Sequence, residues 1–553
     1  MKEWTTACPD WESRILKGEP LIPPPLFPEQ AEVGLRYFRE LRIVDAPGSP
    51  TMGEACRPWL LDFVGSVFGA YDAETGRRLL TEFFLLISKK NAKSTGAAGI
   101  MLSALLWNWR QSAEFLILAP TIEVANNSFF PARDMVRQDE ELSTLLYVQD
   151  HYRTITHRTT NATLKVVAAD NEAVGGKKAT GVLIDELWLF GKRPGAENML
   201  REATGGLASR PEGFVIYATT QSDEPPAGVF RQKLDYARGV RDGRIKDKRF
   251  LPVLYEFPQS VIDAGGHLKA ENLRITNPNL GASVDVEFLE RELQKAKEGG
   301  PESLVGFLSK HANVEIGLAL KSDGWAGADY WEAQGMSPGL SLDDLISESE
   351  VLTVGIDGGG LDDLLGLCVM GRRRSDGHWL AWHRAYAHPS VLERRKSEAP
   401  RFKDFANDGD LILVESVGED VDLVADAVQQ CHESGLLDKV GVDPAGIGAI
   451  VDAMIGRGLE MDQIVGVPQG WKLNGAIKTA ERKLAAAQLH HGGTRLMNWC
   501  TGNAKVVPVG NAITITKQAS GTAKIDPLMA TFNATSLMML NPQPKAAVSL
   551  HFL

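Results

Sequence analysis

The chain has 553 residues, and at roughly 100–200 residues per domain this length predicts two to four domains. Hydrophobic residues make up 44% and charged residues 24%, which is ordinary globular usage and excludes long disorder or a fibrous repeat. No apolar stretch approaches the ~20 residues of a membrane span, and the N-terminus lacks the apolar core of a secretory signal. We therefore expect a cytoplasmic protein without a membrane partner.

Charge and cysteine content narrow the possible partners. Lys and Arg number 59 and Asp and Glu 71, so the formal net charge is −12. This balance argues against a chain that coats nucleic acid over its whole surface, so any such contact must be local. The five cysteines are scattered without a C-x-x-C pair, which suits reduced thiols and argues against a zinc site.

The first half of the chain predicts an arm followed by an α/β domain. Residues 1–50 are rich in proline and predict an extended arm with one short helix at 31–41. Four nearly continuous apolar runs then read as strands covered on both faces, and an alanine-rich, helix-like stretch at 94–109 separates the first two. The four runs are EFFLLISKK, AEFLILAPT, GVLIDE and GFVIYATT. This order predicts a parallel central sheet.

The second half predicts a connector and another α/β unit. Residues 257–345 are polar and helix-compatible, and we expect them to form a connector. Strand-like runs begin at VLTVGIDGGG and continue through LGLCVMG, HWLAWHRAYA, LILVE, KVGVD, QIVGVP and AITITK. Helix-like segments are expected at 420–434, 447–457, 475–490 and 525–541.

The segment ISKKNAKST at 87–95 is a candidate phosphate loop between a strand and a helix. Such a loop needs a tight turn, a lysine that reaches the β- and γ-phosphates and a hydroxyl for the metal. Lys93, Ser94 and Thr95 supply the last two. Ile87 and Ala92 stand where the usual pattern has glycines, so a basic loop before a helix is the alternative interpretation.

Two further strand ends strengthen the ATPase hypothesis. The strand GVLIDE ends in Asp185 and Glu186, which suit a metal-binding carboxylate and a group that activates water. The strand FVIYATT leads into Thr219, Thr220 and Gln221, which could sense a γ-phosphate from the same sheet edge. A strand that simply ends in a polar turn is the alternative for each run. The three strand ends together favour an ATPase.

Three aspartates of the second α/β unit form another candidate site. Asp357 ends one strand, Asp443 ends another, and Asp526 begins a helix. Oxygen ligands without histidine or cysteine suit Mg²⁺ or Mn²⁺, and two ions ~4 Å apart could drive phosphodiester hydrolysis. The element order agrees with a ribonuclease-H-like nuclease. Each aspartate alone could instead be a turn residue or a helix cap.

Taken together, these motifs resemble the large terminase subunit of tailed bacteriophages over about residues 55–540. The resemblance rests on RPWLLDFVGSVFGAYDAETGRRLLTEFFLLISKKNAKST, ILAPTIEVANN, VLIDELWLF, VGIDGGGLDDLLGL and the stretch from MNWCTGNAKVV to KIDPLMATFNA. It implies an α/β fold in which a P-loop ATPase domain of the ASCE type, with a parallel central sheet, precedes a ribonuclease-H-like nuclease domain. It also implies ATP with Mg²⁺, and two divalent ions in the nuclease site.

The resemblance assigns roles to individual residues. The ATP-binding set is Lys90, Asn91, Lys93, Ser94, Thr95 and Asp185, with Ser94 and Asp185 toward Mg²⁺. Glu186 becomes the catalytic residue of the ATPase, and Thr219, Thr220 and Gln221 become the coupling motif. The catalytic and metal-binding residues of the nuclease are Asp357, Asp443 and Asp526; Asp363 matches a further family position.

The sequence departs from the family in two places. Ala92 replaces the glycine before the lysine, and Leu60 follows Pro58-Trp59 where the family often has a glutamine that contacts adenine. The family also uses an arginine supplied by a neighbouring subunit. Lys177, Lys178, Arg201 and Arg210 are the candidates for that role in this chain.

The expected activity is ATP-driven translocation of viral double-stranded DNA into a procapsid, coupled to two-metal cutting of concatemeric DNA. The alternative is a ribonuclease-H-class nuclease or recombinase with a degenerate ATPase domain. The expected division is an arm at 1–50, an ATPase domain at 51–256, a connector at 257–345 and a nuclease domain at 346–553.

Partners implied by the resemblance are double-stranded DNA, a portal protein and a small terminase subunit. We expect a monomer in isolation and a homo-oligomeric ring on the procapsid, in the host cytoplasm and transiently at the portal vertex.

Clustered basic residues are the candidate DNA contacts of this acidic chain. Segment 231–249 holds eight basic and three acidic residues, a net charge of +5. The two other runs are Arg372, Arg373 and Arg374, and Arg394, Arg395 and Lys396. We favour the last two runs, because they follow early strands of the unit that carries Asp357 and could flank its cleft. A solvated loop is the alternative for each run.

Overall fold

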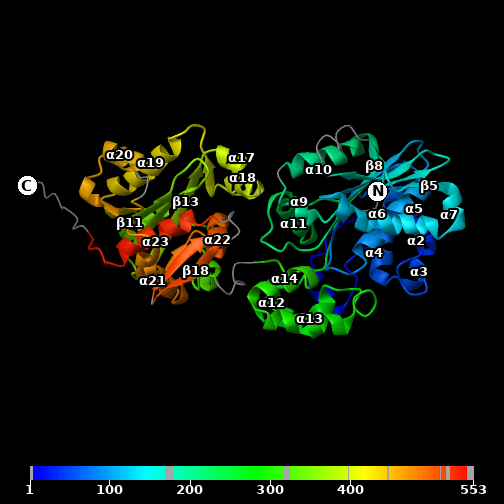
Figure 1. The fold of residues 1–553 in the computed structure, drawn as a ribbon, viewed down its shortest axis with the longest axis horizontal. Helices are drawn as coiled ribbons and strands as arrows, with labels where there is room; N and C mark the ends of the chain where they lie inside the picture. Colours follow the sequence, from blue (N-terminus) through cyan, green and yellow to red (C-terminus); the bar gives the residue numbers. More distant parts are fainter. Residues whose placement is uncertain are drawn as a thin grey trace, which may run out of the picture. The chain divides into compact units, whose positions relative to one another are not determined.

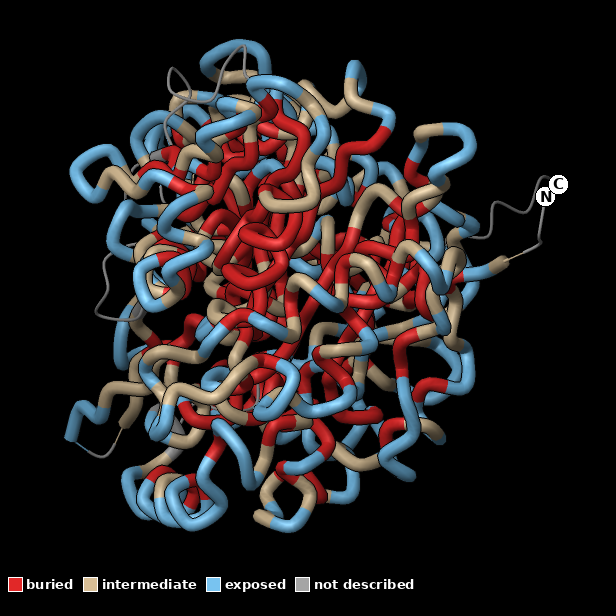
Figure 2. Tube along the Cα trace, turned by 90° about the vertical axis from the view of Figure 1, so that its right-hand side faces the viewer, coloured by how far each residue is buried: buried red, intermediate tan, exposed pale blue. Residues whose placement is uncertain are grey.

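The computed structural model describes residues 4–168, 178–193, 195–316, 324–396, 398–444, 448–510, 512–517 and 524–544. The chain divides into two compact units, Met1–Ile316 and Gly317–Leu553 (Figure 1). The division falls inside the expected connector at 257–345, whose first helices belong to the first unit. Buried residues are concentrated in the strands and the helices that face them, and exposed residues in the outer loops (Figure 2).

The first unit contains a mixed sheet of eight strands in the order β10-β3-β9-β8-β4-β7-β6-β5. The six strands from β10 to β7 run parallel, and β6 and β5 are antiparallel additions at one side. The strands of the first unit are β1 (Tyr71–Asp72), β2 (Arg77–Arg78), β3 (Glu82–Leu86), β4 (Glu114–Ala119), β5 (Leu146–Gln149), β6 (Thr154–His157), β7 (Thr163–Ala168), β8 (Ala179–Asp185), β9 (Phe214–Thr219) and β10 (Phe250–Leu254). Strands β1 and β2 form a separate two-stranded sheet.

The helices of this unit cover both faces of the sheet and extend into the connector. They are α1 (Trp11–Lys17), α2 (Pro28–Glu40), α3 (Met52–Ala55), α4 (Pro58–Phe68), α5 (Lys93–Trp107), α6 (Ile122–Arg137), α7 (Glu140–Leu145), α9 (Leu187–Phe190), α10 (Ala196–Gly205), α11 (Gly228–Arg241), α12 (Gln259–Asp263), α13 (Val286–Glu298) and α14 (Pro301–His311). The four predicted strands are present, so the parallel α/β prediction is confirmed. Strand β10 was not predicted, because Pro252 interrupts its apolar run; proline is tolerated there at the sheet edge.

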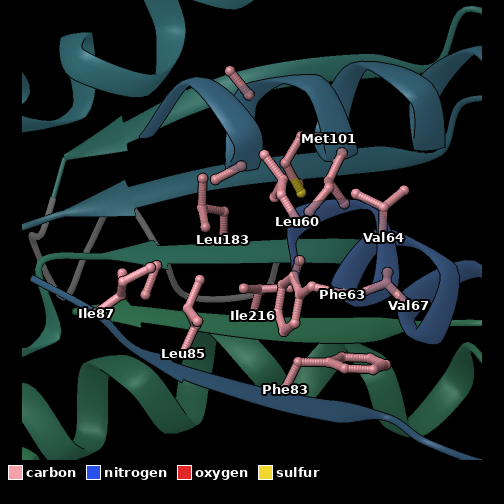
Figure 3. Packing of buried hydrophobic residues seen from close by; sticks show 14 of the residues in the cluster. Leu60, Phe63, Val64, Val67, Phe83, Leu85, Ile87, Met101, Leu183 and Ile216 are labelled. Atoms are coloured by element: carbon pink, nitrogen blue, oxygen red, sulfur yellow. The ribbon is translucent and has the colours of Figure 1, made fainter. Parts of the chain in front are cut away.

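Apolar side chains of α4 pack on one face of the sheet (Figure 3). Phe63 lies against Phe83 of β3, with ring centroids 6.2 Å apart in an edge arrangement. Both side chains are fully buried, so truncation of Phe63 to alanine should cost about 3–5 kcal/mol of stability. This packing holds β3 against α4, and the candidate phosphate loop begins at the carboxyl end of that strand.

The N-terminal region differs from the expected extended arm with one short helix. It contains both α1 and α2, and α2 packs against α4 and α5 with Phe38 fully buried. Trp11 of α1 lies under the guanidinium of Arg241, at 3.8 Å. The helix expected at 31–41 is present as α2, which begins earlier because Pro28 stands at its start, where proline favours a helix; α1 was not expected.

The second unit is built on a seven-stranded sheet in the order β14-β13-β12-β11-β15-β16, with β17 paired to β13. Strands β11, β12 and β13 are antiparallel, whereas β15 lies parallel to β11. The strands of the second unit are β11 (Ser349–Gly358), β12 (Leu365–Arg373), β13 (Trp379–Ala387), β14 (Leu411–Leu413), β15 (Leu437–Val442), β16 (Ile464–Gly466), β17 (Leu489–His491), β18 (Ala504–Val509) and β19 (Ala512–Lys517). This is the predicted ribonuclease-H-like order, three antiparallel strands followed by a helix and a parallel strand.

Helix α23 lies across β11 and β12 (Figure 1). A Cβ at Gly355 would come within 2.0 Å of the Ala530 carbonyl oxygen, so only glycine permits this close approach. The helices of the second unit are α15 (Ala328–Trp331), α16 (Leu342–Glu348), α17 (Ser390–Arg394), α18 (Ala399–Asn407), α19 (Glu419–Glu433), α20 (Gly448–Gly456), α21 (Asn474–Ala485), α22 (Arg495–Gly502) and α23 (Asp526–Met538).

Two predicted elements of this unit differ in the structure. The helix expected at 475–490 ends at Ala485, because Ala487 takes a left-handed conformation with φ 52°, and the next residues form β17. The run AITITK forms β19, which pairs with β18 in a separate two-stranded sheet. Among the described residues, no helix is long and apolar enough to cross a membrane.

Candidate functional site

The turn between β3 and α5 is tight although it lacks the usual glycines. Lys90 and Ala92 take positive φ values of 71° and 57°. This left-handed region is normally occupied by glycine and costs an L-residue roughly 1–2 kcal/mol. Helix α5 begins at Lys93, and the N–H groups of a first helical turn are suited to bind an anion.

Lys93, Ser94, Asp185 and Glu186 meet at the carboxyl edge of the sheet. The Lys93 ammonium donates to Asp185 and lies 2.9 Å from Glu186 Oε1. Ser94 Oγ lies 3.4 Å from Asp185 Oδ2, and Ser128 Oγ donates to the same oxygen at 2.8 Å. The structure thus brings together the lysine, the hydroxyl and both carboxylates that the sequence singled out.

Burial and mutual attraction set the ionisation of this group. Burial lowers the pKa of Lys93, but the adjacent Asp185 and Glu186 carboxylates outweigh it and raise that pKa overall. Burial likewise raises the pKa of Glu186, but the Lys93 charge outweighs it and holds this pKa below its usual value. A charged lysine and a charged glutamate are therefore both maintained at neutral pH.

The other predicted ATP-binding residues are placed differently. Asn91 is fully buried, and its side-chain amide bonds to protein on both sides, to the Asn277 side chain at 2.8 Å and the Asn279 backbone N–H at 3.0 Å. Its side chain therefore clamps the loop to the connector instead of facing a ligand. Lys90 is exposed, and Thr95 is half-buried on the first turn of α5.

Thr219 and Gln221 connect the neighbouring strand to this group. The Trp188 backbone N–H donates to Thr219 Oγ1 at 3.1 Å, and the Trp188 ring N–H donates to Glu186 Oε2 at 2.6 Å. Thr220 and Gln221 are fully buried, and within the described residues neither side-chain polar atom of Gln221 has a hydrogen-bond partner. Glu186 itself has φ 53°, a strained conformation often found at functional sites.

Lys310 of α14 belongs to the same group, and sequence reasoning missed it. Its ammonium lies 3.2 Å from the centroid of the Trp188 ring and donates to the Gln221 carbonyl at 2.8 Å. Its backbone carbonyl accepts from the Lys89 N–H at 2.8 Å. Burial lowers the pKa of Lys310 to about 8. No motif marks this lysine, because its partners lie about 90 or more residues away along the chain.

The contacts of the described candidates for the trans-acting arginine role do not single out any one of them. Lys177 lies outside the described residues. Arg201 pairs with Glu197 one helical turn away, at 2.9 Å. Lys178 and Arg210 lie near the opposite edge of the sheet, before β8 and β9.

Four aspartates form an acidic cluster in the second unit. Asp357 lies at the end of β11, Asp443 directly follows the neighbouring parallel strand β15, and Asp526 begins α23. Asp363 lies in the loop between β11 and β12. A Cβ on Gly358 would lie 3.3 Å from Asp526 Cβ, so α23 begins directly against the end of β11.

The electrostatics of this acidic cluster are unfavourable without a cation. Burial, with the Asp443 and Asp363 charges, raises the pKa of Asp357 to about 7. Burial and Asp363 raise the pKa of Asp526 well above its usual value, and the buried Asp526 Oδ2 has no partner among the described residues. An all-oxygen donor set with an unpartnered buried oxygen fits Mg²⁺ or Mn²⁺. In the described part of the chain, no three His, Cys, Asp or Glu side chains are already arranged to hold a metal ion.

Lys524, which the sequence analysis did not single out, supplies a cation to the cluster. Its side chain is 1% exposed and forms an ion pair with Asp363. Burial raises the pKa of Asp363, but the Lys524 contact outweighs it and lowers that pKa overall. The position two residues before Asp526 was the available signal, since it places the lysine beside the start of α23.

The two arginine runs lie at different ends of the second sheet. Arg372 pairs with Val351 across the β11–β12 ladder, while Asp357 pairs with Gly366. Six residues of strand, roughly 20 Å, therefore separate this run from Asp357. The expectation that it flanks the aspartates is corrected, because β12 runs antiparallel to β11.

Side chains of this run are also occupied. Arg372 pairs with Glu350, Arg373 with Asp376 at 2.5 Å, and Arg374 donates to the Ser347 carbonyl at 3.2 Å. Arg394 ends α17, by contrast, and Arg395 Nε donates to the carbonyl of Asp362 at 3.3 Å, next to Asp363. Only the second run lies beside the acidic cluster.

Part of the chain matches a known protein family. Residues 58–239 match the family described as terminase large subunit, ATPase domain. Protein YmfN of Escherichia coli (strain K12) is 21% identical over 280 residues, which are 48% of this chain and 59% of YmfN. The match thus spans less than two thirds of that relative.

Three solved structures of phage terminases are also similar to this chain. The large terminase of bacteriophage HK97 is 20% identical, with 92% of this chain and 99% of that chain covered and a TM-score of 0.47. The large terminase of a thermophilic bacteriophage, solved in complex with ATP-gamma-S, is 13% identical, with coverages of 92% and 98% and a TM-score of 0.30. The large terminase nuclease of thermophilic phage G20c is 12% identical, with coverages of 39% and 98% and a TM-score of 0.26.

The matched segment contains the loop at Lys93, the acidic pair at the end of β8 and the strand end at Thr219, and it therefore supports the assignment of the ATP site. This match identifies residues 58–239 as an ATPase domain of the terminase large subunit type.

Proposed function

We propose that the chain hydrolyses ATP to move double-stranded viral DNA into a procapsid and cuts concatemeric DNA at the acidic cluster. The observation that carries the ATPase proposal is the contact of Lys93 with Asp185 and Glu186 at the carboxyl edge of a parallel sheet. Nucleotide ligands bind at this edge in open α/β sheets.

Each residue of the ATP site has a proposed task. Lys93 and the first-turn N–H groups of α5 bind the phosphates, and Ser94 and Asp185 hold Mg²⁺, which neutralises phosphate charge when bound. Glu186 accepts the proton of the attacking water, and the hydrogen bond from the Trp188 ring N–H holds its carboxylate in place. Thr219 and Gln221 transmit the state of the site along β9.

The alternative of a degenerate ATPase rests on the missing glycines. Ala92 nevertheless adopts the left-handed conformation that such a glycine would provide, with φ 57°. The missing glycine therefore does not prevent the turn, which favours an active loop over the degenerate alternative.

For the nuclease, we propose that Asp357, Asp443 and Asp526 hold two divalent ions, with Asp363 beside them. Such ions supply a polarised phosphate and an activated water when bound. The chain's own contribution is the donor set, the close approach of α23 to β11, and Lys524, which keeps Asp363 ionised and positioned.

We further propose a portal protein, a small terminase subunit and neighbouring copies in a ring as partners at the procapsid. The four-part division with boundaries at 50, 256 and 345 stays a prediction. The two compact units support only the coarser separation of an ATPase half from a nuclease half.

Separate experiments test the two activities. ATP hydrolysis is measured with and without DNA for the wild type and Lys93→Ala, and plasmid cleavage is measured with Mg²⁺, Mn²⁺ or Ca²⁺ for the wild type and Asp357→Asn. We expect Lys93→Ala to lose hydrolysis but keep cleavage, and Asp357→Asn to do the reverse. Wild-type hydrolysis by Lys93→Ala would overturn the ATP-site assignment, and wild-type cleavage by Asp357→Asn would overturn the nuclease assignment.

A further inference from the structure

A cleft of about 490 Å³ lies at the amino-terminal edge of the first sheet. Its charged lining consists of Arg77, Arg78, Arg210, Lys233, Arg249 and one carboxylate, Glu82. The basic residues come from the β1–β2 hairpin, the loop before β9, helix α11 and the loop before β10. We call these residues the basic cleft.

The basic cleft is separate from the ATP site. The Arg249 carbonyl accepts from the N–H groups of Thr81 and Glu82, at 2.9 and 3.0 Å, so the cleft lies where β3 and β10 begin. The candidate phosphate loop follows the opposite end of β3. The five residue-to-residue steps from Glu82 to Ile87 span roughly 17 Å, so a ligand in the cleft would not touch the Lys93 group.

Lys233 and Arg78 are already bound by other groups of this unit, and Arg210 Nη1 donates to the Ser209 carbonyl at 3.3 Å. Lys233 Nζ lies 3.0 Å from Glu82 Oε2 and 4.5 Å from the centroid of the Tyr217 ring. Arg78 is buried and donates to the backbone carbonyls of Val67 and Glu212. The only carboxylate of the charged lining is thus neutralised within the cleft.

The other three arginines have unused binding capacity. Arg77, Arg210 and Arg249 form no salt bridge within the part of the chain that the structure describes. Arg77 and Arg249 are exposed, whereas Arg210 is half-buried and its Nε is a buried donor without a partner there. A buried donor without a partner is unfavourable, and an anion bound beside it would satisfy it.

We propose that the basic cleft binds the phosphate backbone of duplex DNA through Arg77, Arg210 and Arg249. Guanidinium groups match phosphate oxygens in a bidentate geometry, and three arginines from three separate segments suit a row of phosphates. A positive site is unusual in a chain of net charge −12, so it concentrates the attraction at one place. This inference rests on the proposed function, which makes duplex DNA a partner.

The test compares two triple variants of the full chain that remove the same charge. Arg77→Ala/Arg210→Ala/Arg249→Ala alters the cleft. Its control, Arg14→Ala/Arg39→Ala/Arg137→Ala, removes arginines of the same unit that pair with nearby carboxylates. Fluorescence anisotropy with a short labelled duplex of mixed sequence gives the dissociation constant across a salt series. ATP hydrolysis without DNA is measured in parallel.

We expect the affinity of the cleft variant for duplex DNA to be at least about tenfold lower at low salt. The slope of log K against log salt concentration should become shallower by about 0.9 per lost phosphate contact, or about 2.7 for three contacts. The control should change binding by less than about threefold, since exposed ion pairs contribute little. Hydrolysis without DNA should stay at the wild-type rate in both variants.

Three outcomes would overturn the proposal: unchanged binding by the cleft variant, an equal loss in the control, or saturable binding of inorganic tripolyphosphate at the cleft with no effect on duplex affinity. If the cleft variant fails to fold, the double variant Arg77→Ala/Arg249→Ala replaces it, since it changes only exposed side chains. This double variant should show about two thirds of the change in the salt slope. A wild type that binds duplex at the cleft but hydrolyses no ATP would refute the proposed motor and leave the cleft assignment standing.

Discussion

Replacement of Ala92 by glycine separates a strained but competent phosphate loop from a degenerate one. Ala92 precedes Lys93 and adopts φ 57°. In that conformation the Cβ of an L-residue lies too close to the following carbonyl oxygen. Glycine removes the Cβ and leaves the loop geometry unchanged, so the variant should be more stable and should keep its nucleotide site.

The size of the effect follows from two opposing contributions. Relief of the left-handed strain is worth roughly 1–2 kcal/mol. The greater freedom of glycine in the unfolded chain costs roughly 0.5–1 kcal/mol. The net gain is about 0–1.5 kcal/mol, which for a unit of this size raises the unfolding temperature by at most about 2 °C.

Ala487 provides the matched control. It also has a left-handed conformation, with φ 52°, but is exposed after α21 in the second unit. Scanning calorimetry should show a similar stabilisation for Ala487→Gly, with ATP hydrolysis unchanged. For Ala92→Gly we expect kcat and KM for ATP within about threefold of the wild type, since the loop already has its working shape. An inactive wild type that Ala92→Gly activates would refute this reasoning and favour the degenerate alternative.

Three further predictions concern the carboxylates and Lys310. Glu186→Gln should lower kcat for ATP about 10²–10⁴-fold with little change in nucleotide affinity, which equilibrium binding of a labelled nucleotide measures; a wild-type kcat would refute its role as base. If protonated Lys310 positions Trp188 and Glu186, hydrolysis should fall as the pH rises through about 8, the pKa at which Lys310 loses its charge. Lys310→Arg, which stays charged, should move that decline to higher pH, whereas exposed Lys297→Arg should not; an unshifted profile would contradict the role. Asp357→Asn should raise the unfolding temperature in metal-free buffer, because it removes one anion from the acidic cluster, and should lose most of the Mn²⁺-induced stabilisation, which is about 2.7 kcal/mol at 100-fold excess over Kd. Exposed Asp452→Asn should do neither, and a normal Mn²⁺ shift in Asp357→Asn would contradict the metal assignment.

Sequence patterns predicted the ATP site better than its surroundings. Lys93, Asp185 and Thr219 each follow or end an apolar run, and parallel strands bring such ends to one edge. Asn91 was predicted to face the nucleotide, but its amide bonds to the connector. Lys310 could not be predicted, because α14 reaches the site through tertiary packing that leaves no local pattern.

Lys524 illustrates the same limit in the second unit. The sequence placed Asp357, Asp443 and Asp526 at element ends, where the structure has them. A lysine among surface-compatible residues gives no sign that its side chain is 1% exposed. Its burial depends on how α23 meets β11, and a pattern along one segment contains no information about that contact.

Strand direction accounts for both the correct and the incorrect site predictions. Parallel β3, β8 and β9 end at one edge, which places the ATP-site residues together and leaves the opposite edge, where these strands begin, to Arg77, Arg210 and Arg249. Antiparallel β12 reverses this logic, so a run that follows Asp357 by fifteen residues lies at the far end of the sheet. The segment at 231–249, although set aside in favour of the later runs, contributes Lys233 and Arg249 to the basic cleft. The charge of a run thus predicts a capacity to bind phosphate, and the direction of the neighbouring strand decides which site it can serve.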